Sequence, residues 1–242
     1  MIYLINFATT RFYKSQELLN RSALRFGIDR VVSYREKDIL RTEFYRRNRN
    51  ILDQKRGYGY WIWKPYIIRD AMSKVKKNDI IIYCDSGIEI INPVDPLIKT
   101  CKKQQGIMLF QTHGHLNRTW TKRDCFVLMD CDAPKYWNAE QIMGSFSIYV
   151  NNKRNRDFVN EWLHYCCNET IVTDCANQCG LSNFPDFRDH RHDQSILSLL
   201  AVKHNIEIYR NPSQNGNGRK KAYRNSRYGT ILNHHRKKDK AR

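Results

Sequence analysis

A short apolar run that leads to an acidic residue constrains the fold of this chain more than any other stretch. Residues 80–83 read I-I-I-Y, a β-branched and aromatic run without the alternation of a half-exposed strand. Such a run is typical of a strand buried on both faces, in the middle of a sheet. Asp85-Ser86-Gly87 then puts a carboxylate at the carboxyl end of the strand, where open α/β sheets bind ligands, and Gly87 allows a sharp turn. The alternative is that Asp85 only caps a loop.

The surrounding segments predict a single α/β domain. A strand over 1–8, a helix that begins at Ser15 and closes at Gly27, and a strand over 31–34 have the spacing of a βαβ unit with parallel strands. The pattern predicts further helices over 37–54, 65–75, 93–103, 121–131, 154–167 and 193–203, and further strands over 106–111, 141–150 and 206–209. We therefore expect a mostly parallel central sheet flanked by helices within residues 1–210, followed by a basic segment over 211–242.

Positive charge is concentrated in two places. The net charge is +18, and the last 24 residues contain ten Lys or Arg residues against one acid, Asp239. A second cluster, over 41–56, has six basic residues against Glu43 and Asp53. Such clusters attract polyanions, diphosphates or anionic membrane surfaces, so peripheral membrane contact through the basic tail is one expectation. The alternative is a solvated basic surface that only keeps the protein soluble.

The remaining composition points to a cytoplasmic protein with reduced cysteines. No apolar run reaches the roughly 18 residues of a membrane span. The first six residues resemble a strand and not a signal peptide. Four of the eight cysteines, at positions 166, 167, 175 and 179, are close together, but no C-x-x-C pair supports a zinc site there. We expect reduced structural cysteines and leave the zinc site as the alternative.

Three motifs carry a resemblance to a known family. Residues 56–65 read R-G-Y-G-Y-W-I-W-K-P, residues 85–87 read D-S-G, and residues 190–195 read H-R-H-D-Q-S. In this order they resemble the nucleotide-sugar glycosyltransferases of the GT-A fold, above all a group of small bacterial and viral members, and more loosely glycogenin and the lipopolysaccharide galactosyltransferases. The resemblance spans residues 1–235. It implies a Rossmann-like GT-A domain in the cytoplasm, or in the host cytoplasm if the protein is viral.

The resemblance also implies an activity. The expected reaction is transfer of a sugar, of the hexosyl type, from a nucleotide-diphosphate sugar to a glycan or protein acceptor in glycan biosynthesis. Retention of the anomeric configuration is expected, because the D-Q pair at Asp193 and Gln194 is similar to that of retaining enzymes. Asp193, Gln194 and Asp85 are therefore the expected catalytic residues. Asp193 as a simple helix cap is the alternative, although His190, Arg191 and His192 beside it favour a binding role.

Further site residues are implied by position within the family pattern. The donor-binding residues would be Thr9, Thr10, Lys64, Asp85, Ser86, Gly87, Gly144, Ser145, His192 and Arg236. The acceptor-binding residues would be Trp120 and Lys122. Alternatives remain for four of them: Thr9 and Thr10 could cap a helix, Lys64 could extend outward from a tryptophan core, and Trp120 could be a packed tryptophan.

Metal dependence is the point at which this chain departs from the family. Most GT-A enzymes end the central strand with D-x-D, whereas Gly87 replaces the second acid here. The resemblance implies Mn²⁺ or Mg²⁺ held by Asp85 and by His235 of the C-terminal segment. The alternative is that Lys and Arg side chains neutralise the diphosphate instead. Residues 216–236 could close over the donor as a lid, with a hinge at 215–218, or could be a disordered basic tail.

Two other functions compete with this interpretation. A nucleic-acid-binding protein would explain the charge, but no helix-turn-helix, zinc-finger or RRM signature accompanies it, and no stable nucleic-acid partner is expected. A metal-dependent hydrolase could use Asp85, His190, His192 and Asp193, but no H-E-x-x-H spacing is present.

Overall fold

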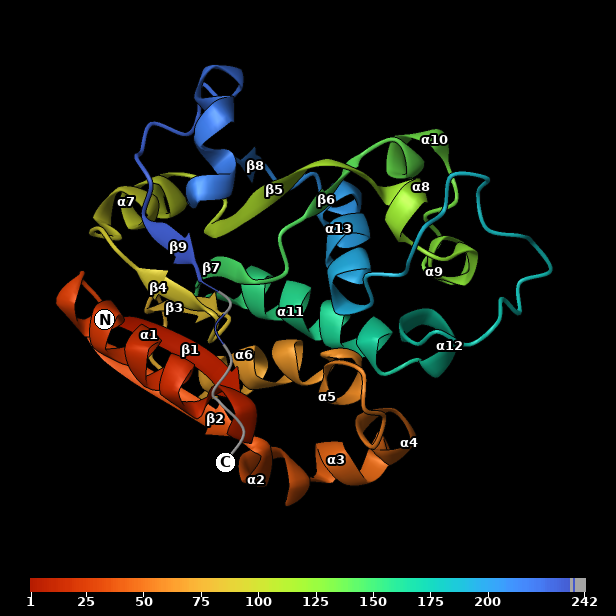
Figure 1. Ribbon diagram of the computed structural model, residues 1–242, viewed down its shortest axis with the longest axis horizontal. Coiled ribbons are helices and arrows are strands. Elements are labelled where there is room, and N and C mark those ends of the chain that lie inside the picture. Colours follow the sequence, from red (N-terminus) through yellow and green to blue (C-terminus); the bar gives the residue numbers. More distant parts are fainter. Residues whose placement is uncertain (236, 238–242) are drawn as a thin grey trace.

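The structure, a computed structural model, describes residues 1–235 and 237 (Figure 1). Its centre is a seven-stranded sheet in the order β2-β1-β3-β7-β5-β6, with β8 paired to β5. The strands of this sheet are β1 (Ile2–Ala8), β2 (Arg30–Arg35), β3 (Ile80–Cys84), β5 (Ile107–Leu116), β6 (Glu140–Ile142), β7 (Phe146–Val150) and β8 (Ile208–Tyr209). A second, two-stranded sheet pairs β4 (Ile88–Ile90) with β9 (Leu232–His234).

Helices surround the central sheet. The longer α-helices are α1 (Tyr13–Arg25), α6 (Trp63–Lys74), α7 (Asp95–Lys103), α11 (Lys153–Cys166) and α13 (Asp193–Lys203). The shorter helices are η1 (Thr10–Phe12), α2 (Glu36–Leu40), α3 (Glu43–Arg47), α4 (Arg49–Leu52), α5 (Gly57–Tyr60), α8 (Asn117–Trp120), α9 (Arg123–Leu128), α10 (Pro134–Trp137), α12 (Glu169–Val172) and η2 (Gln214–Ala222). Within the residues that the structure describes, no helix has the length and apolarity needed to cross a bilayer.

The α/β class is confirmed, but the expectation of a mostly parallel sheet is wrong, because the sheet is mixed. β1 pairs in parallel with β2 and with β3, as the βαβ spacing predicted. β7 is antiparallel to both β3 and β5, and β6 is antiparallel to β5. After β5 the chain turns through α8, α9 and α10 and runs back along β5, first as β6 and then as β7. Antiparallel neighbours need no crossover helix, so strand periodicity alone did not reveal their direction.

β3 is buried on both faces, as its sequence predicted. Ile81 and Tyr83 belong to a core cluster shared with α6, α11 and α13. Ile80, Ile82 and Cys84 belong to a second cluster on the other face, shared with α1 and α7. Each fully buried isoleucine contributes roughly 1.5–3 kcal/mol relative to an exposed one, so this strand anchors both layers.

Several helix boundaries differ from the prediction for local reasons. Residues 37–54 were expected as one helix and instead form α2, α3 and α4. Thr42 interrupts the first of these, because its side chain accepts a hydrogen bond from the Tyr45 backbone and caps α3. Ser15 is buried inside α1 and is not its cap. The segment 121–131 is helical only over α9.

The C-terminal basic segment is packed against the domain over most of its length. Tyr228, Ile231 and Leu232 lie in the second core cluster, and β9 pairs with β4 directly after the central strand. The expected hinge around Gly216 lies in the 3-10 helix η2. Residues 228–232 therefore complete the core on that side of the sheet.

Candidate active site

The end of β3 presents one carboxylate, on Asp85. The Asp85 backbone N–H donates to the Ser145 carbonyl at 2.8 Å, which extends the β3–β7 ladder past the last paired strand residue. The Tyr83 hydroxyl donates to Asp85 Oδ1. Ser86 Oγ donates to the Phe7 carbonyl at 2.7 Å and holds the loop against β1. These hydrogen bonds hold the Asp85 loop in place. The Asp85 side chain is 38% exposed, so its carboxylate is accessible to solvent.

Lys64 connects this loop to the start of α13. Its Nζ lies 2.9 Å from Asp193 Oδ2 and 3.9 Å from Asp85 Oδ1, and it donates to the Gly144 carbonyl at 2.8 Å. The side chains of Lys64 and Asp193 are each 4% exposed. Lys64 therefore does not extend outward from the tryptophan core. Lys64 therefore brings together residues of the three motifs on which the resemblance rests.

Burial and charge compete in this cluster. Burial raises the pKa of Asp193 to about 6, with the Lys64 ammonium opposing the rise and the charge of Asp85 adding to it. Burial lowers the pKa of Lys64, but the charges of Asp193 and Asp85 outweigh it, so the net pKa lies above its usual range and the ammonium stays protonated. Removing one member of such a buried pair leaves an uncompensated charge, which costs about 3–5 kcal/mol.

A left-handed turn places Lys64. Residues 57–61 all have positive φ, between 52° and 83°. The Tyr60 N–H donates to the Arg56 carbonyl at 2.7 Å, so this is one turn of left-handed helix before α6. Each non-glycine residue in that conformation costs roughly 1–2 kcal/mol. A Cβ at Gly57 would lie 2.4 Å from the Trp61 ring, and one at Gly59 would lie 2.6 Å from Leu52 Cα. The glycines of the aromatic motif are therefore required by geometry.

A second strained residue packs against this turn. His192 has φ 53° and ψ −120°, a conformation that favours glycine, and it directly precedes Asp193. Its buried ring stacks on Trp61 with centroids 5.6 Å apart and tilts against Tyr60. The His192 Nδ1–H donates to the Val172 carbonyl at 2.7 Å. The strained turn at residues 57–61 and the strained residue His192 therefore pack against each other, and each lies next in the chain to a member of the Lys64–Asp193 pair or close to it.

The histidines of the H-R-H-D-Q-S motif are neutral supports and not the cationic neighbours that the sequence suggested. Burial lowers the pKa of His192 to about 4. Burial, with the charge of His192 adding to it, lowers the pKa of His190 well below its usual range. His190 Nε2 donates to the Ile171 carbonyl and its Nδ1 accepts from the Lys122 N–H. The exposed charge nearby belongs to Arg56, which pairs with Asp174 and Asp189 at 2.9 and 2.6 Å.

Gln194 and Gly144 lie in contact. Gln194 Oε1 accepts from the Gly144 N–H at 3.4 Å, and its Nε2 donates to Gln141 Oε1 at 3.0 Å. A Cβ at Gly144 would lie 3.2 Å from Gln194 Cβ. Gly144 and Ser145 occupy the break between β6 and β7, one hydrogen bond from Asp85. Gln141 was not anticipated, because its role depends on pairing between distant strands.

The other expected site residues lie around this centre. Thr10 donates its backbone N–H to Glu36 at 2.8 Å, at the carboxyl end of β1. The Trp120 ring lies 4.2 Å below the Arg191 guanidinium. Lys122 is buried and bound to Asp124 and to the Cys175 carbonyl, so it ties two loops together. Arg236 lies outside the described residues.

The single carboxylate of Asp85 fits a divalent cation whose other ligands are the phosphates of a bound diphosphate. Among the residues that the structure describes, no three His, Cys, Asp or Glu side chains form a cluster able to hold a metal ion. Mg²⁺ is usually held by one or two carboxylates plus substrate phosphates, and one accessible carboxylate meets that minimum. His235 is half-buried, and its Nδ1 accepts from the Lys237 N–H, which favours the tautomer with a protonated Nε2. A metal bound by Nε2 would require the other tautomer.

The mixed sheet, with helix layers on both faces, forms a single α/β domain. No protein-family model matches the chain, and no curated protein matches it either. Among solved structures, the crystal structure of mouse xyloside xylosyltransferase 1 in its apo form matches with a TM-score of 0.51. The match covers 97% of this chain and 97% of that one, at 10% sequence identity. At this identity the likeness establishes the fold.

Proposed function

We propose that this chain is a glycosyltransferase that moves a sugar from a nucleotide-diphosphate sugar to a glycan or protein acceptor. The observation that carries the proposal is the Lys64–Asp193–Asp85 cluster at the carboxyl end of β3. It lies where α/β sheets bind ligands, in a fold that is similar along its whole length to a xylosyltransferase. Each member comes from one of the three motifs on which the resemblance rests.

The cluster suggests a division of roles. Asp85 is accessible, and it would contact the ribose or a divalent cation. Gln194, which is partly exposed, would lie beside the anomeric carbon, with the buried Asp193 next to it in the chain. There the bond from the anomeric carbon to the diphosphate oxygen breaks, the acceptor oxygen forms a new bond to that carbon, and the acceptor proton passes to the leaving diphosphate. Lys64 is enclosed by two carboxylates and a carbonyl, so we assign it to positioning Asp193 and not to direct contact with the donor. Retention and a hexosyl donor remain part of the proposal.

The diphosphate that leaves must be stabilised as its charge grows. A Mn²⁺ or Mg²⁺ ion, when bound, would supply that stabilisation with Asp85 as its protein ligand. Thr9, Thr10 and Ser86 lie on the neighbouring β1 and β3 ends, where the nucleoside would pack. Trp120, with Arg191 over its ring, offers an aromatic surface on the side of α13 for the acceptor.

A panel of sugar nucleotides tests this function. We expect one UDP- or GDP-sugar to raise the thermal midpoint, because a ligand at 100 times its Kd stabilises the native state by about 2.7 kcal/mol. The same donor should be consumed in the presence of acceptor or, slowly, of water. Stabilisation by duplex DNA with no response to any sugar nucleotide would contradict the proposal and favour a nucleic-acid-binding protein.

A further inference from the structure

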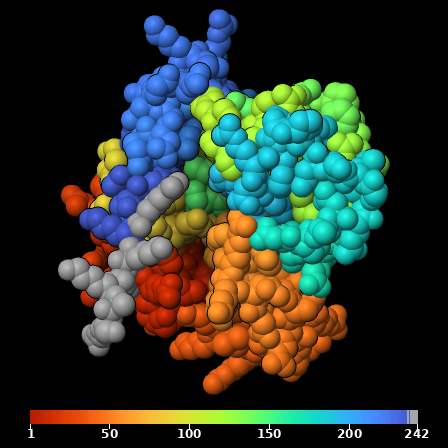
Figure 2. Space-filling view, turned by 45° about the vertical axis from the view of Figure 1, so that its right-hand side comes forward, coloured from red at the N-terminus to blue at the C-terminus, as the bar shows by residue number. Residues whose placement is uncertain are grey.

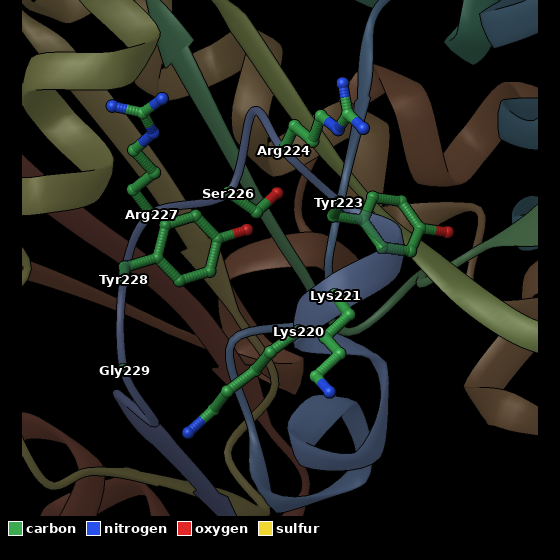
Figure 3. Close-up of a pocket in the computed structure, with 8 residues that line it drawn as sticks. All are labelled: Lys220, Lys221, Tyr223, Arg224, Ser226, Arg227, Tyr228 and Gly229. Carbon is green, nitrogen blue, oxygen red and sulfur yellow. The ribbon is translucent and has the colours of Figure 1, made fainter.

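A basic pocket lies in the C-terminal segment, apart from the Asp85 site. It is a shallow, open depression with a volume of about 520 Å³. Figure 3 shows the residues that line it, which are Lys220, Lys221, Tyr223, Arg224, Ser226, Arg227, Tyr228 and Gly229. Figure 2 shows the segment in blue, projecting at the top of the molecule.

Between residues 210 and 227, all of which the structure describes, no cation has an acidic partner. Six Lys or Arg residues lie between Arg210 and Arg227, and no acid occurs between Glu207 and Asp239. Within the described part of the chain, none of the six has a carboxylate within ion-pair distance. The six are Arg210, Arg219, Lys220, Lys221, Arg224 and Arg227. In the other basic cluster, by contrast, Arg46, Arg49 and Arg56 each pair with an acid at 3.0 Å or less.

A buried guanidinium underlies the pocket. Arg210 is fully buried and packs 4.8 Å from the centre of the Tyr228 ring. It donates to the carbonyls of Asn211, Gly216, Tyr228 and Gly229, and its Nε–H has no hydrogen-bond partner among the described residues. Carbonyl dipoles satisfy most of its donors but leave its charge unneutralised. An anion in the pocket above would reduce that electrostatic cost.

The pocket is held in a defined shape. Tyr228 donates its hydroxyl to the Arg210 carbonyl, and Ser226 Oγ accepts from the Arg210 N–H at 2.9 Å. Gly216 is packed so tightly that a Cβ would lie 1.9 Å from the Asn211 carbonyl oxygen. On the sheet side, the Tyr223 hydroxyl donates to Gln111 Oε1 at 3.3 Å. The pocket is therefore built onto β5.

The strand register places the pocket near the candidate chemistry but not on it. Ile82 of β3 pairs with Ile148 of β7, which pairs with Met108 of β5. β3 and β5 run in the same direction, so Asp85 and Gln111, three residues further along each strand, lie at the same level. Two strand spacings separate them, or about 10 Å. The pocket lies beyond Gln111, which it touches only through the Tyr223 hydroxyl, so it is further from Asp85 than this and too far to share a phosphate with it.

We propose that this pocket binds a phosphate or pyrophosphate group carried by the acceptor. The proposal rests on the function proposed above, because it assigns the diphosphate at Asp85 to the donor and the second anion to the other substrate. Arg and Lys side chains form charge-assisted hydrogen bonds with phosphate oxygens, and the fixed Tyr223 and Tyr228 rings provide flat walls for an attached sugar. The acceptor class is thus a phosphate-bearing glycan.

Inorganic pyrophosphate is the probe, measured by titration calorimetry on the full chain at 0.05 and roughly 0.15 M salt. The test variant is Lys221→Gln/Arg224→Gln/Arg227→Gln. The matched control is Arg46→Gln/Arg47→Gln/Arg49→Gln, which removes the same charge from exposed side chains elsewhere. Both triples change exposed residues, and circular dichroism verifies folding.

The expected result is pyrophosphate binding that the pocket variant weakens by roughly tenfold or more and the control leaves within about twofold. UDP should bind both variants as it binds the wild type, and pyrophosphate should still bind the wild type when UDP saturates the Asp85 site. Equal weakening in both variants, or loss of all pyrophosphate binding when UDP saturates the Asp85 site, would overturn the proposal. If the wild type bound phosphatidylglycerol vesicles but not pyrophosphate, and the pocket variant lost the vesicle binding, the proposal would also be overturned. That result would identify the pocket as a membrane-binding surface. Pyrophosphate binding needs no sugar nucleotide, so failure of this proposal is distinguishable from failure of the transferase assignment.

Discussion

Lys64 and Arg210 are both buried cations, and the groups that surround them differ in charge. Lys64 lies between Asp193 and Asp85 with one carbonyl as a third partner. Arg210 is equally buried but is surrounded by carbonyls, with exposed lysines and arginines above it. The first cation has its counter-charges inside the protein and the second does not. The difference indicates that Lys64 organises acids within the site, whereas Arg210 supports a surface that needs an anion from outside.

The largest expected effect comes from breaking the internal pair. Lys64→Met should lower the free energy of unfolding by about 3–5 kcal/mol, because it leaves two carboxylates without their cation. Activity should be lost with it. Lys74→Met is the matched control in the same helix, since Lys74 is 65% exposed and its pair with Asp70 is on the surface. Urea unfolding should show a change of less than about 1 kcal/mol for the control. A small change for Lys64→Met would contradict the account.

Asp85→Asn separates function from stability in the same cluster. The carboxylate is 38% exposed, so its loss should change the free energy of unfolding little. Transfer should fall by roughly 10²–10³-fold, as expected when one electrostatic partner of the transition state is removed. Steady-state kinetics with the donor from the nucleotide panel measures this. Turnover near the wild-type value in a folded variant would remove Asp85 from the site.

The left-handed turn that places Lys64 can be tested by a pair of glycine substitutions. Gly59→Ala should cost about 3 kcal/mol, from positive φ and from a Cβ only 2.6 Å from Leu52 Cα. Gly180 also has positive φ, 75°, but a Cβ there would meet nothing within 4 Å. Gly180→Ala should therefore cost only about 1 kcal/mol. The difference between the two losses of stability, measured by thermal unfolding, gives the cost of the steric contact with Leu52. Equal losses would show that the positive φ alone accounts for the effect.

The smallest expected effect is a pH dependence. Asp193 has a pKa raised to about 6, so the Lys64–Asp193 pair loses its negative partner as the pH falls through that value. The pH profile of kcat/KM should therefore decline below about pH 6. Stability should respond with the opposite sign: the folded state holds this proton more tightly than the unfolded state, so that contribution is lost as the pH rises from about 4 to 6. A flat activity profile between pH 5 and 7 would contradict the role given to Asp193.

The sequence predicted the parts of this site that depend on local pattern. The apolar run of β3 placed Asp85 at a strand end, and the D-Q pair placed Asp193 at the start of a helix. The left-handed turn at 57–61 was not predictable in the same way, because helical periodicity does not distinguish right-handed from left-handed turns for Tyr and Trp residues. The antiparallel return of β6 and β7 depends on pairing between distant strands. The same is true of Arg210, whose burial follows from Tyr228 folding back over it.

The central claim is that carboxylates inside the protein neutralise Lys64. Its most direct test is a double-mutant cycle on Lys64 and Asp193, with the free energy of unfolding as the readout. If the two charges neutralise each other in the core, Lys64→Met should be destabilising and the double variant should recover part of that loss. Asp193→Asn alone should change stability much less, because the raised pKa of Asp193 already favours its neutral form in the folded state. The coupling energy should then be about 2 kcal/mol or more. Additive losses, with a coupling energy near zero, would show that the pair does not act as a unit and would contradict the account.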